Sequence, residues 1–166
     1  MAGSLIGLDG KPLTDDWQPL PDDAGSWPET GRWIAPLDWA DQRDIPPGEH
    51  GLALANTVDV EAEAERLIRA SLLQLEWPAL ADGRAYTQAR LLRERLGYRG
   101  PIRAIGHVVR DNLWELARCG VDQFALRADQ DPAGCAAAFS SFSVVYQRTA
   151  DRRESVFSRR RESRPA

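Results

Sequence analysis

Five polar side chains follow two predicted strands at the points where those strands turn into helices. They are Asp82, Arg84, His107, Arg110 and Asp111. Because parallel α/β folds bind ligands at the carboxyl ends of their strands, we expect these side chains to share one rim of the molecule. Guanidinium groups and helix N-termini bind anions, and histidine moves protons near neutral pH. The sequence therefore indicates oxyanion binding or acid–base chemistry at this rim.

The turn Asp82-Gly83-Arg84 directly precedes a predicted helix. Free backbone N–H groups at that helix start, beside an arginine, would suit an anion. The same Asp-Gly pair is equally typical of a tight turn that caps a helix and needs no ligand. No Gly-Lys-Ser/Thr follows and no GxGxxG is present, so this is neither a Walker loop nor a dinucleotide fingerprint.

The second predicted turn places His107 after Gly106, with Asp111 four residues further on. A carboxylate at helical spacing can hold an imidazole in one tautomer, or it can simply cap the helix start. No serine or cysteine nucleophile stands beside this pair, and the acidic residues follow no metal-ligand spacing, so we predict neither a metal nor a cofactor. The candidate catalytic residues are His107, Asp111 and Asp82, and the candidate ligand-binding residues are Arg84, Arg110, Gly83 and Gly106.

The segment 50–147 alternates short apolar runs with amphipathic stretches, and this alternation positions the candidate residues. The predicted strands cover 51–56, 71–77, 102–105 and 122–126, and the predicted helices cover 60–69, 85–96, 108–119 and 132–147. Right-handed crossovers would join them as four consecutive βα units. The predicted fold is α/β, with a parallel sheet that is either half-barrel-like or open.

Two segments of different composition flank this core. Residues 1–49 are rich in proline, glycine and aspartate and contain four tryptophans, which are too much apolar surface to leave wet. We expect an irregular arm that packs on the core, with a β-like run at 32–37 kept to a sheet edge by Pro36; full disorder is the alternative. Residues 148–166 are arginine-rich, and we predict a disordered basic tail.

Charge and cysteine content exclude several classes of function. The net charge of −4 divides into −7 for residues 1–50, −1 for 51–147 and +4 for 148–166. A net acidic chain with a short basic tail does not suit dedicated nucleic-acid binding. No signal peptide or membrane span is apparent, so a cytoplasmic protein is expected. Cys119 and Cys135 lack CxxC spacing and are predicted to be buried structural thiols.

Several sequence blocks occurring in order carry a family resemblance. They are Asp82-Gly83-Arg84 with 88–93, 103–106 with Arg110-Asp111, Arg118-Cys119-Gly120 before Asp122, and 142–147. Over residues 34–147 the chain resembles a bacterial family of uncharacterised proteins, domain-of-unknown-function family 934. Members are often encoded beside a sulfite reductase haemoprotein, so the resemblance implies an accessory role in sulfite reduction but no particular reaction. This chain has Asn112 where the family often has glutamine.

Three hypotheses follow. The first is an interaction protein of sulfite reduction that docks on the sulfite reductase haemoprotein or on its electron-donating partner, with no nucleic acid or membrane involved. The second is a small enzyme or oxyanion-binding module that uses the rim residues. The third is a structural domain whose polar turns only cap helices. A second copy of the chain could cover exposed sheet edges, so a homodimer fits any of them.

Overall fold

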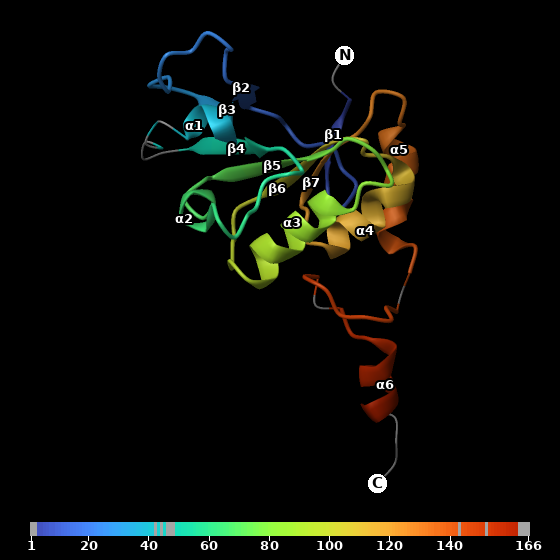
Figure 1. The fold of residues 1–166 in the computed structure, drawn as a ribbon. Coiled ribbons are helices and arrows are strands. Elements are labelled where there is room, and N and C mark those ends of the chain that lie inside the picture. Colours follow the sequence, from blue (N-terminus) through green and yellow to red (C-terminus); the bar gives the residue numbers. More distant parts are fainter. Residues whose placement is uncertain are drawn as a thin grey trace.

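The computed structural model describes residues 3–41, 43, 45, 49–142, 144–151 and 153–162, without the side chains of 160 and 162. One seven-stranded sheet runs through it, in the spatial order β1-β7-β6-β5-β4-β3-β2 (Figure 1). Its strands are β1 (Leu5–Gly7), β2 (Trp17–Pro19), β3 (Arg32–Pro36), β4 (His50–Leu54), β5 (Leu72–Trp77), β6 (Ile102–Gly106) and β7 (Gln123–Ala125). The helical elements are α1 (Leu37–Ala40), α2 (Ala64–Leu67), α3 (Arg84–Glu94), η1 (Arg110–Asn112), α4 (Leu113–Arg118), α5 (Pro132–Cys135), η2 (Ala136–Ser140) and α6 (Val156–Glu162).

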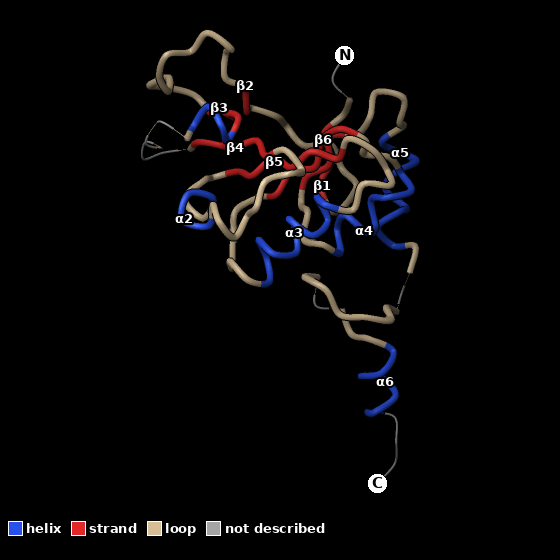
Figure 2. Tube along the Cα trace, in the orientation of Figure 1, coloured by secondary structure: helices blue, strands red, loops and turns tan. Residues whose placement is uncertain are grey.

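The sheet is mostly parallel. Strands β2 to β6 each pair in parallel with the next strand along the chain, and only β1 runs antiparallel, against β7. The sheet curls like a half-barrel, with α3 and α4 on one of its faces (Figures 1 and 2). The predicted α/β class and the parallel pairing of the core strands are confirmed. The carboxyl ends of β3 to β6 consequently lie side by side, and we call this end of the sheet the rim.

The helix-covered face of the sheet holds the main core. On β5, the side chains of Leu73, Leu75 and Trp77 alternate with more exposed residues and are fully buried. They belong to one apolar cluster with the inner stripe of α3, whose buried members include Ala85 and Ala89. Period-two alternation on the strand and helical spacing on α3 thus meet face to face, as the sequence predicts.

The N-terminal arm, residues 1–49, is not simply irregular. It contributes three strands, β1, β2 and β3, to the same sheet as the core. Strand β3 is not at the edge either, because β2 pairs with its first three residues, 32–34. Pro36 lies beyond that pairing, so its missing N–H group breaks no bond to β2. Strands of three residues carry too little alternation to be recognised in sequence.

Two predicted helices are shorter than expected. Within 60–69 only α2 is α-helical, and the helix expected over 132–147 stops with η2 at Ser140. The hydroxyls of Ser140 and Ser141 both donate to the carbonyl of Ala137, at 3.2 and 3.4 Å. Serine side chains that bond locally compete with the helical backbone pattern, which favours a helix end here.

The basic tail, residues 148–166, is ordered over part of its length. Helix α6 occupies 156–162 and projects away from the sheet (Figure 1), and a bridge between Val145 and Ser155 ties its start to the preceding segment. The prediction of a disordered tail is therefore wrong for these residues, whereas 152 and 163–166 lie outside the described residues. Across the part of the chain that the structure describes, none of the helices is long and apolar enough to cross a bilayer.

Candidate functional site

The turn after β5 binds its own arginine. The carboxylate of Asp82 accepts hydrogen bonds from Arg84 Nε at 3.0 Å and Nη2 at 2.6 Å, and from the Arg84 backbone N–H at 3.2 Å. Asn56, which follows β4, donates to the same carboxylate at 2.7 Å. The Arg84 guanidinium is the main reason that the pKa of Asp82 falls to about 2. Arg84 therefore already has an anion, supplied by the chain two residues earlier.

Gly106 fixes the approach of β6 to β5 at the rim. Its φ of +87° is in the left-handed region, and a Cβ placed there would lie 2.4 Å from the carbonyl oxygen of Trp77. That carbonyl accepts the backbone N–H of His107 at 2.6 Å. Only glycine fits this contact without displacing the backbone. The predicted Gly-His pair thus sets the position of the histidine beside the end of β5.

The His107 ring lies against an arginine rather than a carboxylate. Arg127 Nη1 is 3.4 Å from Nδ1 and 3.5 Å from Nε2 of the ring. Arg127 in turn donates to both oxygens of Asp129, at 2.6 and 2.7 Å, and this pairing lowers the pKa of Asp129 to about 2. The arginine found here, although it follows a predicted strand, was not among the predicted site residues.

Asp111 does not meet His107. Within the described residues no hydrogen bond or ion pair joins them, and the Asp111 side chain is 81% exposed, 3.9 Å from Arg110. The helical structure begins only at residue 110, with the 3₁₀ turn η1, and Val109 before it is extended, so His107 lies outside the helix and the four-residue spacing does not place it on one helix face with Asp111. Asn112 takes the capping role instead, accepting from the N–H of Val109 at 2.9 Å and donating to the His107 carbonyl at 2.8 Å.

A cavity of about 560 Å³ opens at the rim, over the ends of β3, β4 and β5. Its floor and walls are partly apolar, and five carboxylates line it, while none of its lining residues is lysine or arginine. The carboxylates are those of Asp38, Asp41, Asp59, Glu63 and Glu76. We call this feature the acidic cavity. Within the described residues, no three acidic, histidine or cysteine side chains are grouped closely enough to hold a metal ion.

Long-range contacts shape the acidic cavity. Gln88 of α3 is buried, and its Nε2 donates to the carbonyls of Ala55 and Val58, both at 2.9 Å, which fixes the loop that lines the cavity after β4. Arg66 pairs with Asp41 and, at 3.1 Å, with Glu63. None of these residues is among the candidate site residues predicted from the sequence. The excess of seven negative charges in residues 1–50 is the one signal that anticipates an acidic surface here.

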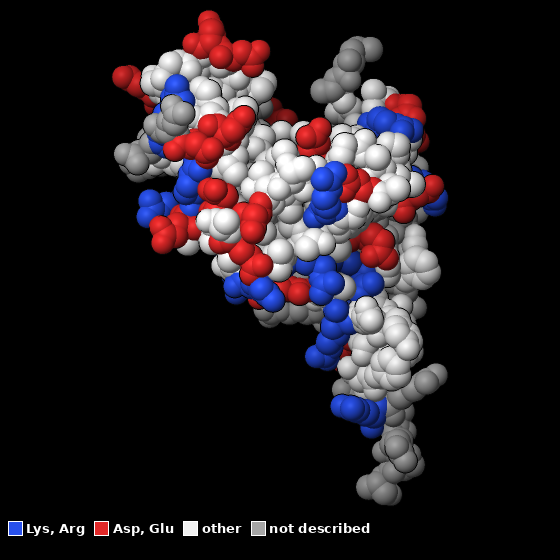
Figure 3. Space-filling view, viewed as in Figure 1, with Lys and Arg blue, Asp and Glu red and all other residues white. Residues whose placement is uncertain are grey.

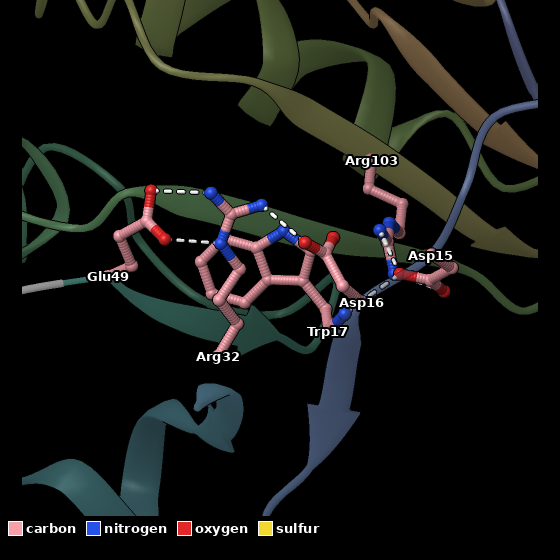
Figure 4. A network of polar contacts seen from close by, with 6 residues as sticks. All are labelled: Asp15, Asp16, Trp17, Arg32, Glu49 and Arg103. Carbon is pink, nitrogen blue, oxygen red and sulfur yellow. Dashed lines mark hydrogen bonds and ion pairs between the residues drawn. The ribbon is translucent and has the colours of Figure 1, made fainter. Parts of the chain in front are cut away.

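The face of the sheet that α3 and α4 do not cover carries a network of ion pairs (Figure 4). Arg103 of β6, with a side chain only 5% exposed, donates to both oxygens of Asp15 at 2.8 and 3.1 Å. Next to it, Arg32 pairs with Asp16 at 2.8 Å and with Glu49, and lies over the ring of Trp17. The arm is thereby held on the sheet by charges from residues distant in sequence.

Acidic side chains gather on the part of the surface that β2, β3 and α1 occupy, whereas blue side chains predominate toward the tail (Figure 3). This distribution follows the charge of −7 in residues 1–50 and of +4 in residues 148–166. The acidic cavity, which is lined partly by Asp38 and Asp41 at α1, therefore lies beside a surface rich in acidic side chains, and such a surface attracts cationic groups over several ångströms.

Comparison with curated proteins and with solved structures finds no match. Comparison with family models finds one, described as "Bacterial protein of unknown function (DUF934)", over residues 51–157. The match covers the strands from β4 onward, all of the candidate rim residues and the start of the tail. Because it spans well over half of the 166 residues, the chain belongs to this DUF934 family of bacterial proteins.

Proposed function

We propose that this protein acts by protein–protein interaction, with the acidic cavity as the docking site for a basic surface of its partner. The observation that carries the proposal is a cavity of about 560 Å³ lined by five carboxylates and by no basic side chain. The family resemblance suggests the partner, which is the sulfite reductase haemoprotein or the protein that supplies it with electrons. In this proposal the chain is an accessory component of sulfite reduction.

The charge pairing at the rim favours docking over anion binding. Arg84 is held by Asp82 and Arg127 by Asp129, so neither guanidinium is free for a ligand oxyanion. Two of the five cavity carboxylates, Asp41 and Glu63, pair with Arg66. The other three form no ion pair among the described residues, and such carboxylates attract arginine or lysine side chains and raise the rate of association with a basic surface. In folds built from consecutive βα units, ligands bind at the carboxyl ends of the strands. If the core consists of four such units, the proposed docking site lies at that same end of the sheet.

The proposal is tested by affinity capture from a cell extract of the source bacterium, with tagged protein at low and high salt. We expect the sulfite reductase haemoprotein or its electron donor to be retained at low salt and released at high salt, because screening weakens exposed charge pairs. Neutralising Asp38 and Glu76 (Asp38→Asn with Glu76→Gln) should reduce capture strongly. Both side chains line the cavity, and within the described part of the chain neither carboxylate forms an ion pair.

The matched control neutralises two exposed acids elsewhere on the arm, Asp23→Asn with Glu29→Gln. This variant changes the net charge by the same two units and should capture the partner as the parent protein does. Equal loss in both variants would show that only overall charge matters. Retention of no sulfur-pathway protein by the parent at low salt would contradict the proposal outright.

Oxyanion binding at the rim is the second candidate function, and one feature of α3 favours it. The N-cap residue Gly83 has no side chain, and Asp82 accepts the backbone N–H of Arg84 at 3.2 Å. The N–H groups that follow in the first turn have no acceptor within the helix, which suits an anion. In this alternative Arg84, Arg110 and the glycines 83 and 106 bind the anion, and His107, Asp111 and Asp82 handle protons. Calorimetry with sulfite on the parent and on Arg84→Ala tests it, and heat that is equal in both would exclude Arg84 from binding.

A further inference from the structure

Exposed aromatic and basic side chains gather at helix α6. Tyr146 and Phe157 are 68% and 49% exposed, and their rings meet edge to face with centroids 5.1 Å apart. Arg161 follows Phe157 by four residues, so these two side chains share one face of α6. Arg148 lies beside the same helix and donates from Nη2 to Ser158 Oγ at 3.4 Å. We call Tyr146, Arg148, Phe157 and Arg161 the tail patch.

The composition of the tail patch is that of an interaction surface. Tyrosine, phenylalanine and arginine are enriched where proteins contact one another, and large aromatic side chains carry much of the binding energy there. Both arginines are exposed, and neither forms an ion pair among the described residues. The segment 148–166 as a whole carries a charge of +4. A fitting partner is therefore acidic and has an apolar hollow that admits an aromatic ring.

The acidic cavity of this same chain has both properties. Asp38 and Glu76 line it, are exposed and form no ion pair among the described residues. Partly exposed Val58 and Ile105 contribute to its apolar surface. Its volume of about 560 Å³ is within the range of about 300–1,000 Å³ found for pockets that hold drug-sized ligands, so it has room for a phenyl ring and a guanidinium together. The tail patch and the acidic cavity are thus complementary in charge and in chemistry.

The two surfaces lie at opposite ends of the molecule and cannot meet within one chain. Helix α1, which lines the acidic cavity, is far from α6 (Figure 1), and the acidic and basic regions are likewise separated (Figure 3). The tail is anchored to the core by the Arg118–Asp151 ion pair, whose side chains are 11% and 14% exposed, and α6 starts directly after Ser155. Seven helical residues extend about 10 Å beyond this anchor, less than the radius of gyration of about 15 Å expected for a domain of 166 residues.

We propose that the tail patch of one copy of this chain docks in the acidic cavity of a second copy. Arg148 and Arg161 pair with Asp38 and Glu76 of the second copy, and the Phe157 ring enters the apolar part of the cavity. Because the two surfaces differ, the copies associate head to tail. The inference rests on the proposed function in one respect, namely that the acidic cavity receives a basic surface. A second copy and the proposed partner then compete for the same cavity.

The test measures the molar mass of the purified full chain by light scattering and sedimentation, over a range of concentrations up to millimolar. At low salt we expect the mass to rise with concentration above the 18.5 kDa of one chain, and at high salt to return to that value, because salt screens exposed charges. Asp38→Asn with Glu76→Gln, and separately Arg148→Gln with Arg161→Gln, should each weaken self-association by about tenfold or more.

Each of these variants has a matched control of equal charge change. Asp23→Asn with Glu29→Gln removes two exposed acids outside the cavity, and Arg69→Gln with Arg99→Gln removes two exposed arginines outside the tail patch. Both controls should associate as the parent does.

Mixing the cavity variant with the tail variant adds a positive test. One intact cavity and one intact tail patch remain in the mixture, on different chains, so we expect a species of two chains that neither variant forms alone. Its appearance also shows that both variants are folded.

A parent chain that stays monomeric at millimolar concentration in low salt would overturn the proposal. Equal weakening by the control variants, or a mixture of the two variants that stays monomeric, would also contradict it. A monomeric parent that binds single-stranded RNA through Arg148 and Arg161 would assign the tail patch to nucleic acid instead. Because the measurement uses the purified chain alone, its failure leaves the capture experiment undecided, and failure of the capture experiment leaves this result unchanged.

Discussion

Removal of the Asp15 carboxylate should weaken the attachment of the arm to the sheet. Asp15 is the only partner that gives the buried Arg103 guanidinium a negative charge, through hydrogen bonds of 2.8 and 3.1 Å within the described residues. Asp15→Ala leaves a guanidinium that is 5% exposed, with a single remaining hydrogen bond among the described residues, to Gln123 Oε1 at 3.1 Å. The structure therefore predicts a loss of stability far above that of an ordinary surface change.

The expected magnitude follows from burial. Breaking a fully buried ion pair by deleting one partner costs about 3–5 kcal/mol of unfolding free energy. Here Asp15 is 40% exposed, and the arm can move aside so that water reaches Arg103. Both effects reduce the penalty, so we expect about 1–3 kcal/mol, which is close to the value of a hydrogen bond to a charged group.

The adjacent residue supplies the control. Asp16 pairs with Arg32 at 2.8 Å, but these side chains are 59% and 37% exposed. Exposed pairs contribute about 0–1 kcal/mol, and Arg32 keeps Glu49 as a second partner, so Asp16→Ala should cost about 0.5 kcal/mol or less. The assay is urea unfolding of the parent and both variants, followed by tryptophan fluorescence. The arm carries four of the six tryptophans and thus reports on its own release.

A double variant separates the buried charge from the lost contact. Arg103→Met removes the guanidinium, so adding it to Asp15→Ala should recover part of the lost stability, because no unpaired charge remains buried. Equal costs for Asp15→Ala and Asp16→Ala, or a double variant less stable than Asp15→Ala, would refute the reasoning. In that case the arm would be held mainly by the pairing of its strands and by its apolar contacts.

Three further predictions concern the rim and the core. Gly106→Ala should destabilise the protein by at least about 2 kcal/mol in urea unfolding, because the φ of +87° is unfavourable for alanine and the new Cβ would collide with the Trp77 carbonyl. Gly83→Ala is the control: φ is −80° there and the space around the new Cβ is open, so this variant should be neutral or slightly stabilising. The buried Cys119 thiol, whose pKa burial raises from 9.0 to about 11, should react with a thiol reagent about a hundredfold more slowly in the native protein than in urea. The Asp82 carboxyl should titrate near pH 2 by NMR, and Arg84→Ala should move its pKa up toward 3.8. A carboxyl whose pKa is lower in the folded than in the unfolded protein stabilises the fold at every pH above the unfolded-state pKa. This contribution is therefore present at neutral pH and is lost as the pH falls toward 2.

The core strands and α3 are predictable because local pattern and burial agree. The run from 71 to 77 is apolar and ends at a proline, and the stripe through Ala85, Ala89 and Leu92 recurs at helical spacing and ends before Gly97. Each signal is internal to its element and needs no knowledge of the partner. The three-residue strands β1 and β2 are defined by their pairing instead, and such information is absent from their own residues.

The candidate site likewise contains one contact that can be predicted from the sequence and one that cannot. The Asp82 and Arg84 contact spans two residues, and the turn that forms it is readable from the sequence as an Asp-Gly pair. The pairing of His107 with Arg127 joins the ends of β6 and β7, and it depends on how those strands are aligned. The expected partner, Asp111, does not reach His107 because the helical structure starts at residue 110, after the extended Val109, and leaves the histidine outside it.

One residue, Gly51, carries a signal in the sequence for a contact between segments that are distant along the chain. Gly51 lies inside β4, where glycine weakens a strand and often marks the close approach of another group. A Cβ at this position would lie 3.1 Å from Ile34 Cγ1 and 3.2 Å from the ring of Trp17. The absence of a side chain thus makes room for a tryptophan of the arm on the face of the sheet that α3 and α4 do not cover. A strand glycine together with a tryptophan-rich flanking segment therefore predicts a covered sheet face, even where the covering segment has no periodicity of its own.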